Sequence, residues 1–426
     1  MAKDIPSRSA ISAVLSYRLF RYLWFGQITS QLALNMLIFV LALVVYQATG
    51  SNAAVSGLFL AYGIPAVFFG MVAGAVVDRL DKRFILLSCD ITRAILVSVL
   101  FFATRYIGVI YLFVFLNALI NQLYVPAEAP TIPRLVPEKN LVSAISLFSF
   151  TYYSSMALGF ILAGPALRVF GNQGSLLFIS GLFLLACLFV SRLPKEEDGA
   201  EKLTRILRYK ALYIFQRVLS DLSEGLRYVA NQPTLSDALF LLTGTQVILA
   251  ILGTLGPGFA DRVLGIDVRD ASVVIVGPTV AGIILGALWV GSRGFRIPAE
   301  RLIRTGIVSA GTLLMAIAAS VTVARWGWFG LPRWVVLPFS FLLFFLLGVA
   351  NSLLDVPANS LLQKEAAGDM RGRVYGMLAA AVGGLGMLPV VVGGVLADVV
   401  GVGKVIFLLG AVVLVYGVWR VRYNRI

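Results

Sequence analysis

Long uninterrupted runs of apolar residues dominate the pattern of hydrophobic and polar positions along this chain. Most runs extend to about 20 residues, the length that an α-helix needs to cross the hydrocarbon core of a bilayer. Strands would instead alternate apolar and polar residues, with a turn about every 10 positions, and no segment has that pattern. The pattern predicts an all-α membrane protein with twelve transmembrane helices, at 20–46, 52–77, 84–104, 107–126, 142–166, 174–191, 236–260, 271–292, 302–323, 335–356, 374–397 and 403–419.

Composition supports a membrane protein. Hydrophobic residues make up 59% of the 426 positions and charged residues only 13%, and the mean hydropathy is +0.91. A soluble chain of this length would need a far larger charged surface. The net charge of +14 raises nucleic-acid binding as an alternative, so the placement of the basic residues has to be considered.

The basic residues are distributed unequally across the predicted membrane. Arg93 lies within a span, and 27 of the 35 Lys and Arg residues lie on the side that holds both termini. Seven lie on the other side: Arg105, Arg168, Arg262, Arg269, Arg325, Arg333 and Lys404. The positive-inside rule then predicts a multi-pass protein of the cell membrane with both termini cytoplasmic. The positive charge faces the anionic inner leaflet, so no nucleic-acid partner is expected. Residues 1–19 contain no apolar stretch, and no cleavable signal peptide is expected there.

One long polar segment divides the chain. Residues 1–192 are expected to form an N-terminal six-helix bundle, residues 193–234 a cytoplasmic linker, and residues 235–426 a C-terminal six-helix bundle. Six linker positions share one face of a helix, which predicts either an amphipathic helix on the membrane surface or a solvated connector: Ile214, Val218, Leu222, Gly225, Leu226 and Val229.

The two predicted bundles show traces of a repeat. Val125-Pro126-Ala127 at the end of the fourth span recurs 231 residues later as Val356-Pro357-Ala358 at the end of the tenth. The pair Gly164 and Gly171 recurs 230 residues later as Gly394 and Gly401, around the end of the eleventh span. Two matches at nearly the same offset indicate a duplicated unit, and many secondary transporters use duplicated halves for alternating access.

The turn between the second and third spans contains the sequence GAVVDRLDKRF, residues 74–84. Gly74 permits close approach of a neighbouring helix. Asp78 is placed where an anion can interact with a helix N-terminus, and Arg79, Lys82 and Arg83 hold the turn on the cytoplasmic side. This arrangement resembles the loop signature of the major facilitator superfamily, a Gly followed by Asp-Arg and then a basic pair.

The resemblance continues along the chain in FRYLWFGQITSQL, VYQATGS, YVPAEAPTIPRLVPEKNLVSAISL, DLSEGLRYVANQP and MRGRVYGM. Together these segments resemble the twelve-span drug-antiporter branch that includes macrolide-efflux and enterobactin-exporter proteins. The resemblance implies two pseudo-symmetric six-helix bundles and proton-coupled efflux of small compounds. It also implies that Gly74, Asp78, Arg79, Lys82 and Arg83 form a conformational latch, with Asp78 contacting the start of the eleventh span near Arg371 or Arg373.

The sequence departs from the family pattern in two places. The second-half counterpart GALWVGSRGFR, from Gly286, has no Asp at the matching position, so a one-sided latch is expected. In the fifth span Gly159 and Gly164-Pro165 are present, but Arg168 and Val169 stand where small residues are expected. This second departure weakens the inference of export. For Lys82 and Arg83, a role in setting topology is an equal alternative to the latch.

Polar residues within the spans are candidates for function. Asp90 and Arg93 lie three residues apart on one face of the third span, where mutual pairing is the favoured interpretation and a proton-linked role the alternative. Substrate candidates come from the first, fourth, seventh and tenth spans, with interhelical hydrogen bonding as the alternative for each: Gln27, Gln31, Asn35, Asn117, Asn121, Tyr124, Gln246, Asn351 and Asp355.

The sequence thus predicts a secondary active transporter, an exporter of small amphipathic or hydrophobic compounds. A lipid or siderophore carrier is the alternative, and a non-transporting membrane sensor a further one. The chain has no His and no phosphate-binding Gly-Lys-Ser/Thr loop, so an enzyme, a metal site or a cofactor is not expected. Asp90, Glu128 and Asp355 are the carboxylates left to carry protons. Substrate identity, coupling ion and oligomeric state are not defined, although a monomer is compatible with the sequence.

Overall fold

The computed structural model describes residues 10–77, 80–195, 227–325, 333–366 and 371–423, which are helical for the most part and contain no strand. Two compact units are present. The first unit comprises Met1–Leu41 and Ile64–Val218, and the second comprises Ala42–Gly63 and Leu219–Ile426. The turn that joins the first two long helices therefore belongs to the second unit, although it lies early in the chain.

The first unit is built from helices of the N-terminal half. Its elements are α1 (Ala10–Leu15), α2 (Arg18–Thr49) as far as Leu41, α3 (Asn52–Val77) from Ile64, α4 (Lys82–Ala103), α5 (Ile107–Glu128), η1 (Ala129–Thr131), α6 (Ile132–Leu135) and α7 (Glu138–Val190).

The second unit contains the remaining helices together with the ends of α2 and α3 at residues 42–63. Its further elements are α9 (Pro233–Phe259), η2 (Ala260–Leu264), η3 (Val268–Asp270), η4 (Ser272–Val276), α10 (Gly277–Ser292), η5 (Gly294–Arg296), α11 (Ala299–Arg325), α12 (Arg333–Glu365), α13 (Arg371–Ala380), η7 (Ala381–Leu385), α14 (Met387–Val400) and α15 (Val402–Tyr423).

Twelve passes follow from these elements. Ten helical stretches in the described part of the chain are long and apolar enough to cross a membrane. One of them, α7, is 53 residues long and is broken at Gly171, where the backbone angles are φ 67° and ψ −177°, so it supplies two passes. The 26-residue helix α3 supplies one more. The predicted all-α membrane fold with twelve transmembrane helices is confirmed.

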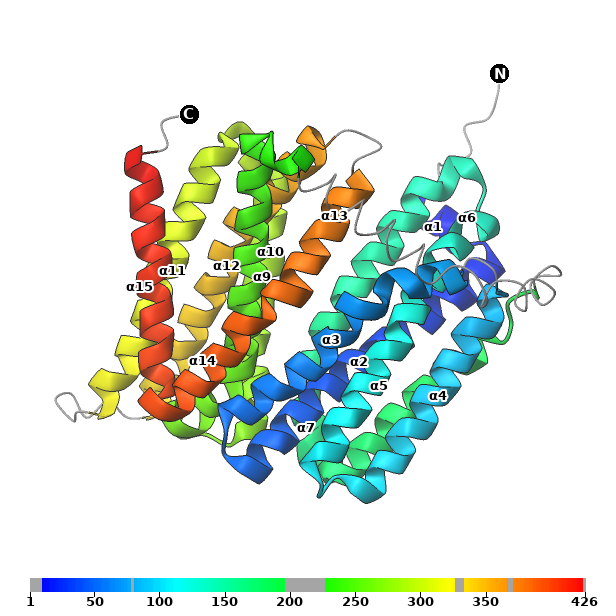
Figure 1. Cartoon of the computed structure of the whole chain (residues 1–426), viewed down its shortest axis with the longest axis horizontal. Coiled ribbons are helices and arrows are strands. Elements are labelled where there is room, and N and C mark those ends of the chain that lie inside the picture. Colours follow the sequence, from blue (N-terminus) through cyan, green and yellow to red (C-terminus); the bar gives the residue numbers. More distant parts are fainter. Residues whose placement is uncertain (1–9, 78–79, 196–226, 326–332, 367–370, 424–426) are drawn as a thin grey trace. The chain divides into compact units, whose positions relative to one another are not determined.

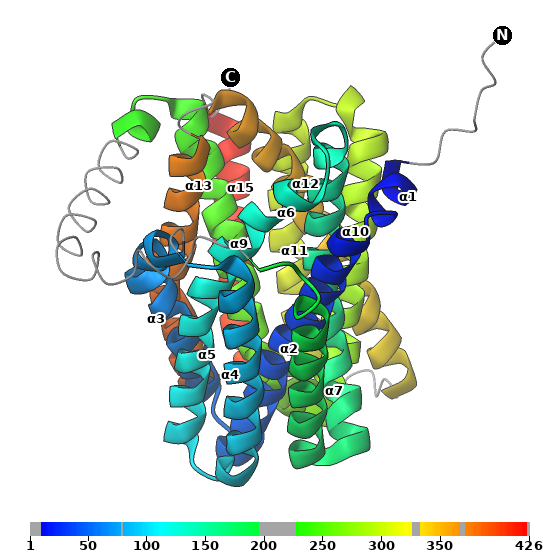
Figure 2. The same cartoon turned by 90° about the vertical axis from the view of Figure 1, so that its right-hand side faces the viewer.

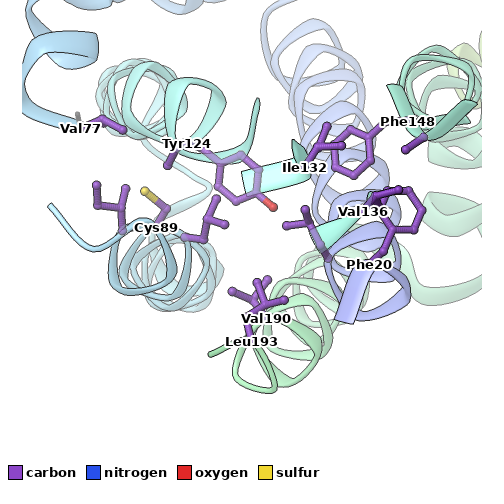
Figure 3. Packing of buried hydrophobic residues seen from close by; sticks show 14 of the residues in the cluster. Phe20, Val77, Cys89, Tyr124, Ile132, Val136, Phe148, Val190 and Leu193 are labelled. Carbon is purple, nitrogen blue, oxygen red and sulfur yellow. The ribbon is translucent and has the colours of Figure 1, made fainter. Parts of the chain in front are cut away.

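In the first unit, α4 packs against both α5 and α7, and α4 and α5 run side by side in Figure 2. α4 begins after Asp81, whose carboxylate accepts a hydrogen bond from the Arg83 backbone N–H at 2.9 Å and so caps the helix. The core joins α2, α4, α5 and α7 around Phe20, Tyr124 and Phe148, which are all buried. Figure 3 shows the Tyr124 ring pointing from its helix into the middle of this cluster.

In the second unit, α11 packs between α12 and α15, and α11 runs beside the red helix α15 in Figure 1. α10 approaches α12 closely because a glycine stands at the contact on each helix. A Cβ on Gly282 would collide with the Phe345 carbonyl oxygen, and one on Gly348 with the Thr279 carbonyl oxygen. Small residues allow such backbone contact in membranes, where dispersion forces hold helices together.

A buried arginine ties three helices of the second unit together. Arg420 of α15 is 2% exposed. Its guanidinium donates to the Asp237 carboxylate of α9 at 2.6 Å through both Nη atoms and to the Glu300 carboxylate of α11 at 3.0–3.1 Å. Paired in this way with two carboxylates, the guanidinium is satisfied inside the protein.

Glycines with positive φ mark equivalent turns in the two halves. In the described residues they are Gly50, Gly171, Gly265 and Gly401. Gly50 and Gly265 follow the first and seventh passes, and Gly171 and Gly401 end the fifth and eleventh. Only glycine adopts these angles at little cost. The paired positions agree with the repeat that the sequence indicates at Gly171 and Gly401.

The predicted linker is only partly described. Residues 196–226 lie outside the described part of the chain, and these include most of the predicted amphipathic helix. The proposed division at residues 192 and 235 remains a prediction.

Candidate functional site

A buried polar cluster lies inside the first unit. Asp90 and Arg93 of α4 are both 0% exposed and form an ion pair, with Arg93 Nη1 3.8 Å from Asp90 Oδ1. Ser30 of α2 bridges them: its hydroxyl donates to Asp90 Oδ1 at 2.7 Å and accepts from Arg93 Nη1 at 3.2 Å. The three side chains therefore form one connected network between α2 and α4.

The fourth pass and the second half of α7 complete the surroundings of Arg93. Its Nη2 donates to Asn121 Oδ1 of α5 at 2.9 Å. The guanidinium carbon lies 4.8 Å from the centre of the Tyr124 ring and 5.7 Å from that of Phe183. These distances are within the range of cation–π attraction, which is strongest for desolvated cations. Arg93 is thus held by a carboxylate, a hydroxyl, an amide and two aromatic rings.

Several atoms of this cluster form no hydrogen bond that meets normal geometry with any described residue. They are Asp90 Oδ2, Arg93 Nε, the Tyr124 hydroxyl and Glu128 Oε1, all buried, although the Tyr124 hydroxyl lies near both Glu128 and Ser30. Glu128 ends α5 and is 5% exposed, and it lies within electrostatic reach of Asp90 and Arg93. Two buried carboxylates therefore lie within electrostatic reach of one guanidinium. A buried carboxylate oxygen that makes no hydrogen bond is costly, so these atoms require an explanation.

The three substrate candidates on α2, Gln27, Gln31 and Asn35, make different contacts. Gln27 donates to the Phe148 carbonyl oxygen at 3.2 Å and accepts from the Thr151 hydroxyl at 3.0 Å, so it joins α2 to α7. Gln31 is 2% exposed and its Nε2 is unpaired. Asn35 donates to the Gln31 carbonyl oxygen at 2.8 Å. α7 approaches Asn35 so closely that a Cβ on Gly159 would lie 2.9 Å from the Asn35 Cβ.

The other substrate candidates lie in both units. Asn117 of α5 donates to the Phe113 carbonyl oxygen at 3.2 Å, while its own Oδ1 is buried and unpaired. In the second unit Gln246 of α9 is exposed and Asn351 of α12 is half-buried. Asp355 lies near Thr245 and Asn359, with Oδ1 buried and unpaired. The structure brings Asn121 and Tyr124 together with Asp90 and Arg93, which the sequence analysis had assigned to a separate site.

The predicted latch is only partly described. Gly74 lies in α3, and Asp78 and Arg79 lie outside the described residues. Lys82 begins α4 and donates to the Leu80 carbonyl oxygen at 3.1 Å. Arg83 Nη2 donates to the Ser191 carbonyl oxygen at 2.6 Å and so joins the start of α4 to the end of α7.

An acidic residue of α14 holds the turn between α2 and α3 within the second unit. Asp398 accepts hydrogen bonds from the backbone N–H groups of Asn52 and Ala53, each at 2.9 Å, and from the Ser51 hydroxyl at 2.6 Å. The Asn52 amide adds a bond at 2.9 Å. Asp398 thus satisfies the free N–H groups at the start of α3, where the helix dipole also favours an anion.

Two residues after the seventh pass reinforce this contact. Arg262 lies 3.7 Å from Asp398 Oδ1 and also donates to the Gly50 carbonyl oxygen. Asp261 accepts a hydrogen bond from the Tyr46 hydroxyl at 3.1 Å. Residues 46–53 are therefore bound to both α14 and the end of the seventh pass.

The sequence analysis missed Ser30, Phe183 and Asp398. The spacing of Ser30 could have identified it, because it follows Gln27 by three positions and shares its helical face. Asp398 could have been identified as a lone acid at the end of an apolar span. Phe183 gave no such signal, since it is one aromatic residue in an apolar run and only the fold brings it to Arg93.

Comparison with known proteins agrees with this architecture. A sequence profile of the Major Facilitator Superfamily matches residues 23–388. The chain is 26% identical to the uncharacterized MFS-type transporter YfiS of Bacillus subtilis over 383 residues, covering 89% of this chain and 86% of the relative. It is 24% identical to the multidrug efflux pump Tap of Mycolicibacterium fortuitum over 395 residues, covering 90% of each. In fold it is similar to the nucleoside transporter NupG, with a TM-score of 0.72, 15% identity and coverage of 96% and 99%.

Proposed function

The chain belongs to the Major Facilitator Superfamily, and we propose that it is a secondary active transporter that exports small amphipathic or hydrophobic compounds in exchange for protons. The similarity to the multidrug efflux pump Tap along 90% of both chains supports export. The excess of Lys and Arg on one side of the predicted membrane supports a cell-membrane location with both termini cytoplasmic.

The observation that carries the coupling proposal is the charge balance of the buried cluster. Asp90 and Glu128 face a single guanidinium, that of Arg93. Among the described residues, the Tyr124 hydroxyl and the thiols of Cys89 and Cys187 also lie within electrostatic reach of Asp90. With both carboxylates ionised, the site would hold one uncompensated negative charge in an apolar interior, which is unfavourable. One bound proton removes that charge. The protonated carboxyl group then has an O–H that can donate a hydrogen bond to another oxygen of the cluster.

A proton held in this way can be exchanged for substrate. Arg93 contacts Asn121 and Tyr124 on the fourth pass and Ser30 on the first, and these two passes carry most of the first-unit substrate candidates. A compound that displaces Asn121 or Tyr124 from Arg93 changes which carboxylate the guanidinium compensates. Binding of substrate and binding of the proton thereby become competing events, as antiport requires.

Substrate contact is assigned to polar groups that have bonding capacity left. Gln31 Nε2 and Asn117 Oδ1 are a donor and an acceptor, both buried and both without a hydrogen bond to any described residue. In the second unit, considered by itself, Asp355 Oδ1 is an acceptor that is buried and unpaired among the described residues. A few such groups among apolar and aromatic walls suit uncharged or cationic amphipathic ligands, since they orient a ligand loosely. Gln27 has both ends of its amide engaged by α7, so we assign it to helix packing.

Alternating access requires contacts that form in one state and break in the other. We assign this role at one end of the second pass to Gly74, Asp78, Arg79, Lys82 and Arg83, with the start of α13 near Arg371 or Arg373 as the partner of Asp78. At the other end of the same pass, the contacts of Asp398 with residues 51–53 supply a second latch. Each would close one side of the transporter.

Transport into everted membrane vesicles tests the proposal. We expect uptake of at least one dye or antibiotic from a broad panel when the vesicle interior is acidified, and loss of that uptake when the proton gradient is collapsed. Vesicles that contain the Glu128→Gln variant at equal abundance provide the matched control. The absence of gradient-dependent uptake for every compound would contradict the assignment to proton-coupled export.

A further inference from the structure

One face of α11 carries four polar side chains and one valine, whereas the rest of the helix has the composition of a membrane span. Arg301, Arg304, Thr305, Val308 and Ser309 recur at intervals of three and four residues, so they form a single stripe. The apolar stretch of this helix runs from Ala299 to Ala319. The stripe therefore covers about 12 Å from the start of the span inward, at a rise of about 1.5 Å per residue.

The two arginines of this stripe, Arg301 and Arg304, differ from Arg420 in their ion pairs. Arg301 is exposed and Arg304 half-buried. Neither forms an ion pair or a side-chain hydrogen bond with any described residue. The acid next to them, Glu300, is already engaged by Arg420 at 3.0 Å. Two guanidinium groups one helical turn apart thus have no counter-ion within the part of the chain that the structure describes.

The stripe also lines a hollow. A cavity of about 490 Å³ is bounded, among the described residues, by Arg301, Arg304, Thr305, Val308 and Ser309. Its lining changes along the helix. The two arginines lie near the start of α11, and Thr305, Val308 and Ser309 follow farther along the span. The Ser309 hydroxyl makes no hydrogen bond within the described residues, whereas the Thr305 hydroxyl donates to the Arg301 carbonyl oxygen at 2.8 Å and leaves its oxygen free to accept.

We propose that this groove binds the headgroup of an anionic phospholipid. A guanidinium recognises phosphate through two parallel hydrogen bonds, and Arg301 and Arg304, one helical turn apart, line the same hollow. The glycerol and ester oxygens of the lipid then reach Thr305 and Ser309, and the first methylenes of an acyl chain lie along Val308. A basic groove at the end of a transmembrane helix meets such headgroups at their own depth in the bilayer.

Native mass spectrometry of the purified full chain tests the proposal, with phosphatidylglycerol and phosphatidylcholine of equal acyl length as probes. The variants are Arg301→Gln with Arg304→Gln, the charge-conserving Arg301→Lys with Arg304→Lys, and the matched control Arg293→Gln with Arg296→Gln in the preceding turn. Gel filtration confirms that each variant is folded. We expect wild-type protein and the control to bind phosphatidylglycerol equally, and the first variant to bind it roughly 30-fold more weakly, about 5-fold for each arginine. The lysine variant should retain an intermediate affinity.

Three results would overturn the proposal. Equal weakening by the control pair would show that general positive charge attracts the lipid. Unchanged binding by the first variant would place the lipid elsewhere. Glycerol 3-phosphate competing as effectively as phosphatidylglycerol would identify the groove as a site for soluble anions.

Discussion

The carboxylate of Asp398 accepts a hydrogen bond at 2.9 Å from the backbone N–H of Asn52, a residue 346 positions earlier in the chain. Asp398 lies near the end of the eleventh pass, and Asn52 begins the second. The proposed contact of Asp78 with the start of α13 has the reverse relation, with an acid after the second pass and a partner at the start of the eleventh. The same two passes would therefore be latched at both ends by the same device, an anion at a helix N-terminus.

Removal of the Asp398 charge should open its latch. In Asp398→Asn the dipole of α3 loses its anion and the Asp398–Arg262 ion pair is lost, so we expect transport to fall and the turn at residues 50–53 to become more accessible to a thiol reagent at an introduced cysteine. The stability cost should be about 0.5–2 kcal/mol, the usual range for a helix cap. Asp267→Asn removes another capping carboxylate, which accepts from the Arg269 N–H at 2.9 Å, and should leave transport unchanged. Equal loss in both variants would contradict the latch.

The Asp90–Arg93 pair should behave as a coupled unit. Either Asp90→Asn or Arg93→Gln leaves a buried charge without its partner, so each single variant should lose about 3–5 kcal/mol of stability. The double variant removes both charges and should be more stable than the sum of the single effects predicts, by about 0.5–3 kcal/mol. Unfolding in mixed micelles measures this cycle. Strict additivity would show that the two side chains do not compensate each other.

Glu128 should affect coupling more than stability. Glu128→Gln is close to isosteric and keeps a buried polar group, while it removes the second carboxylate that Arg93 compensates. We expect normal unfolding behaviour and normal substrate exchange down a concentration gradient, together with at least a tenfold loss of transport driven by a pH gradient. Gradient-driven transport that matches the wild type would exclude Glu128 from coupling.

The turns that end the fifth and eleventh passes should require glycine. Gly401 has φ 100° and ψ 142°, a conformation that alanine adopts only with strain, so Gly401→Ala should cost about 1–3 kcal/mol. Gly171→Ala, at φ 67°, should also destabilise. A suitable control is Gly181→Ala, within α7, because an added Cβ there meets nothing within 4 Å. This control should be neutral or stabilising by up to about 1 kcal/mol, and a comparable loss of stability there would mean that backbone strain is not the cause.

The sequence was informative about the fold because apolar runs of membrane-spanning length are a local signal. The fifth span was predicted to end at residue 166, shortly before the break at Gly171, and the glycine pair with Gly401 was visible as a repeat. The candidate site was harder to predict, since its contacts are not local. Asp90 and Arg93 were recognised as a pair by their spacing within one helix, but Ser30, Asn121 and Phe183 join them only through the packing of α2, α5 and α7.

Proton movement measured in proteoliposomes addresses the central claim most directly. Purified protein is reconstituted with a pH-sensitive dye inside the vesicles, and a transported compound is added to the outside without any imposed pH gradient. We predict that the wild type moves protons out as the compound enters, and that Glu128→Gln exchanges the compound without any change in internal pH. Equal proton movement by the two proteins, or none by the wild type while the compound is transported, would contradict the account.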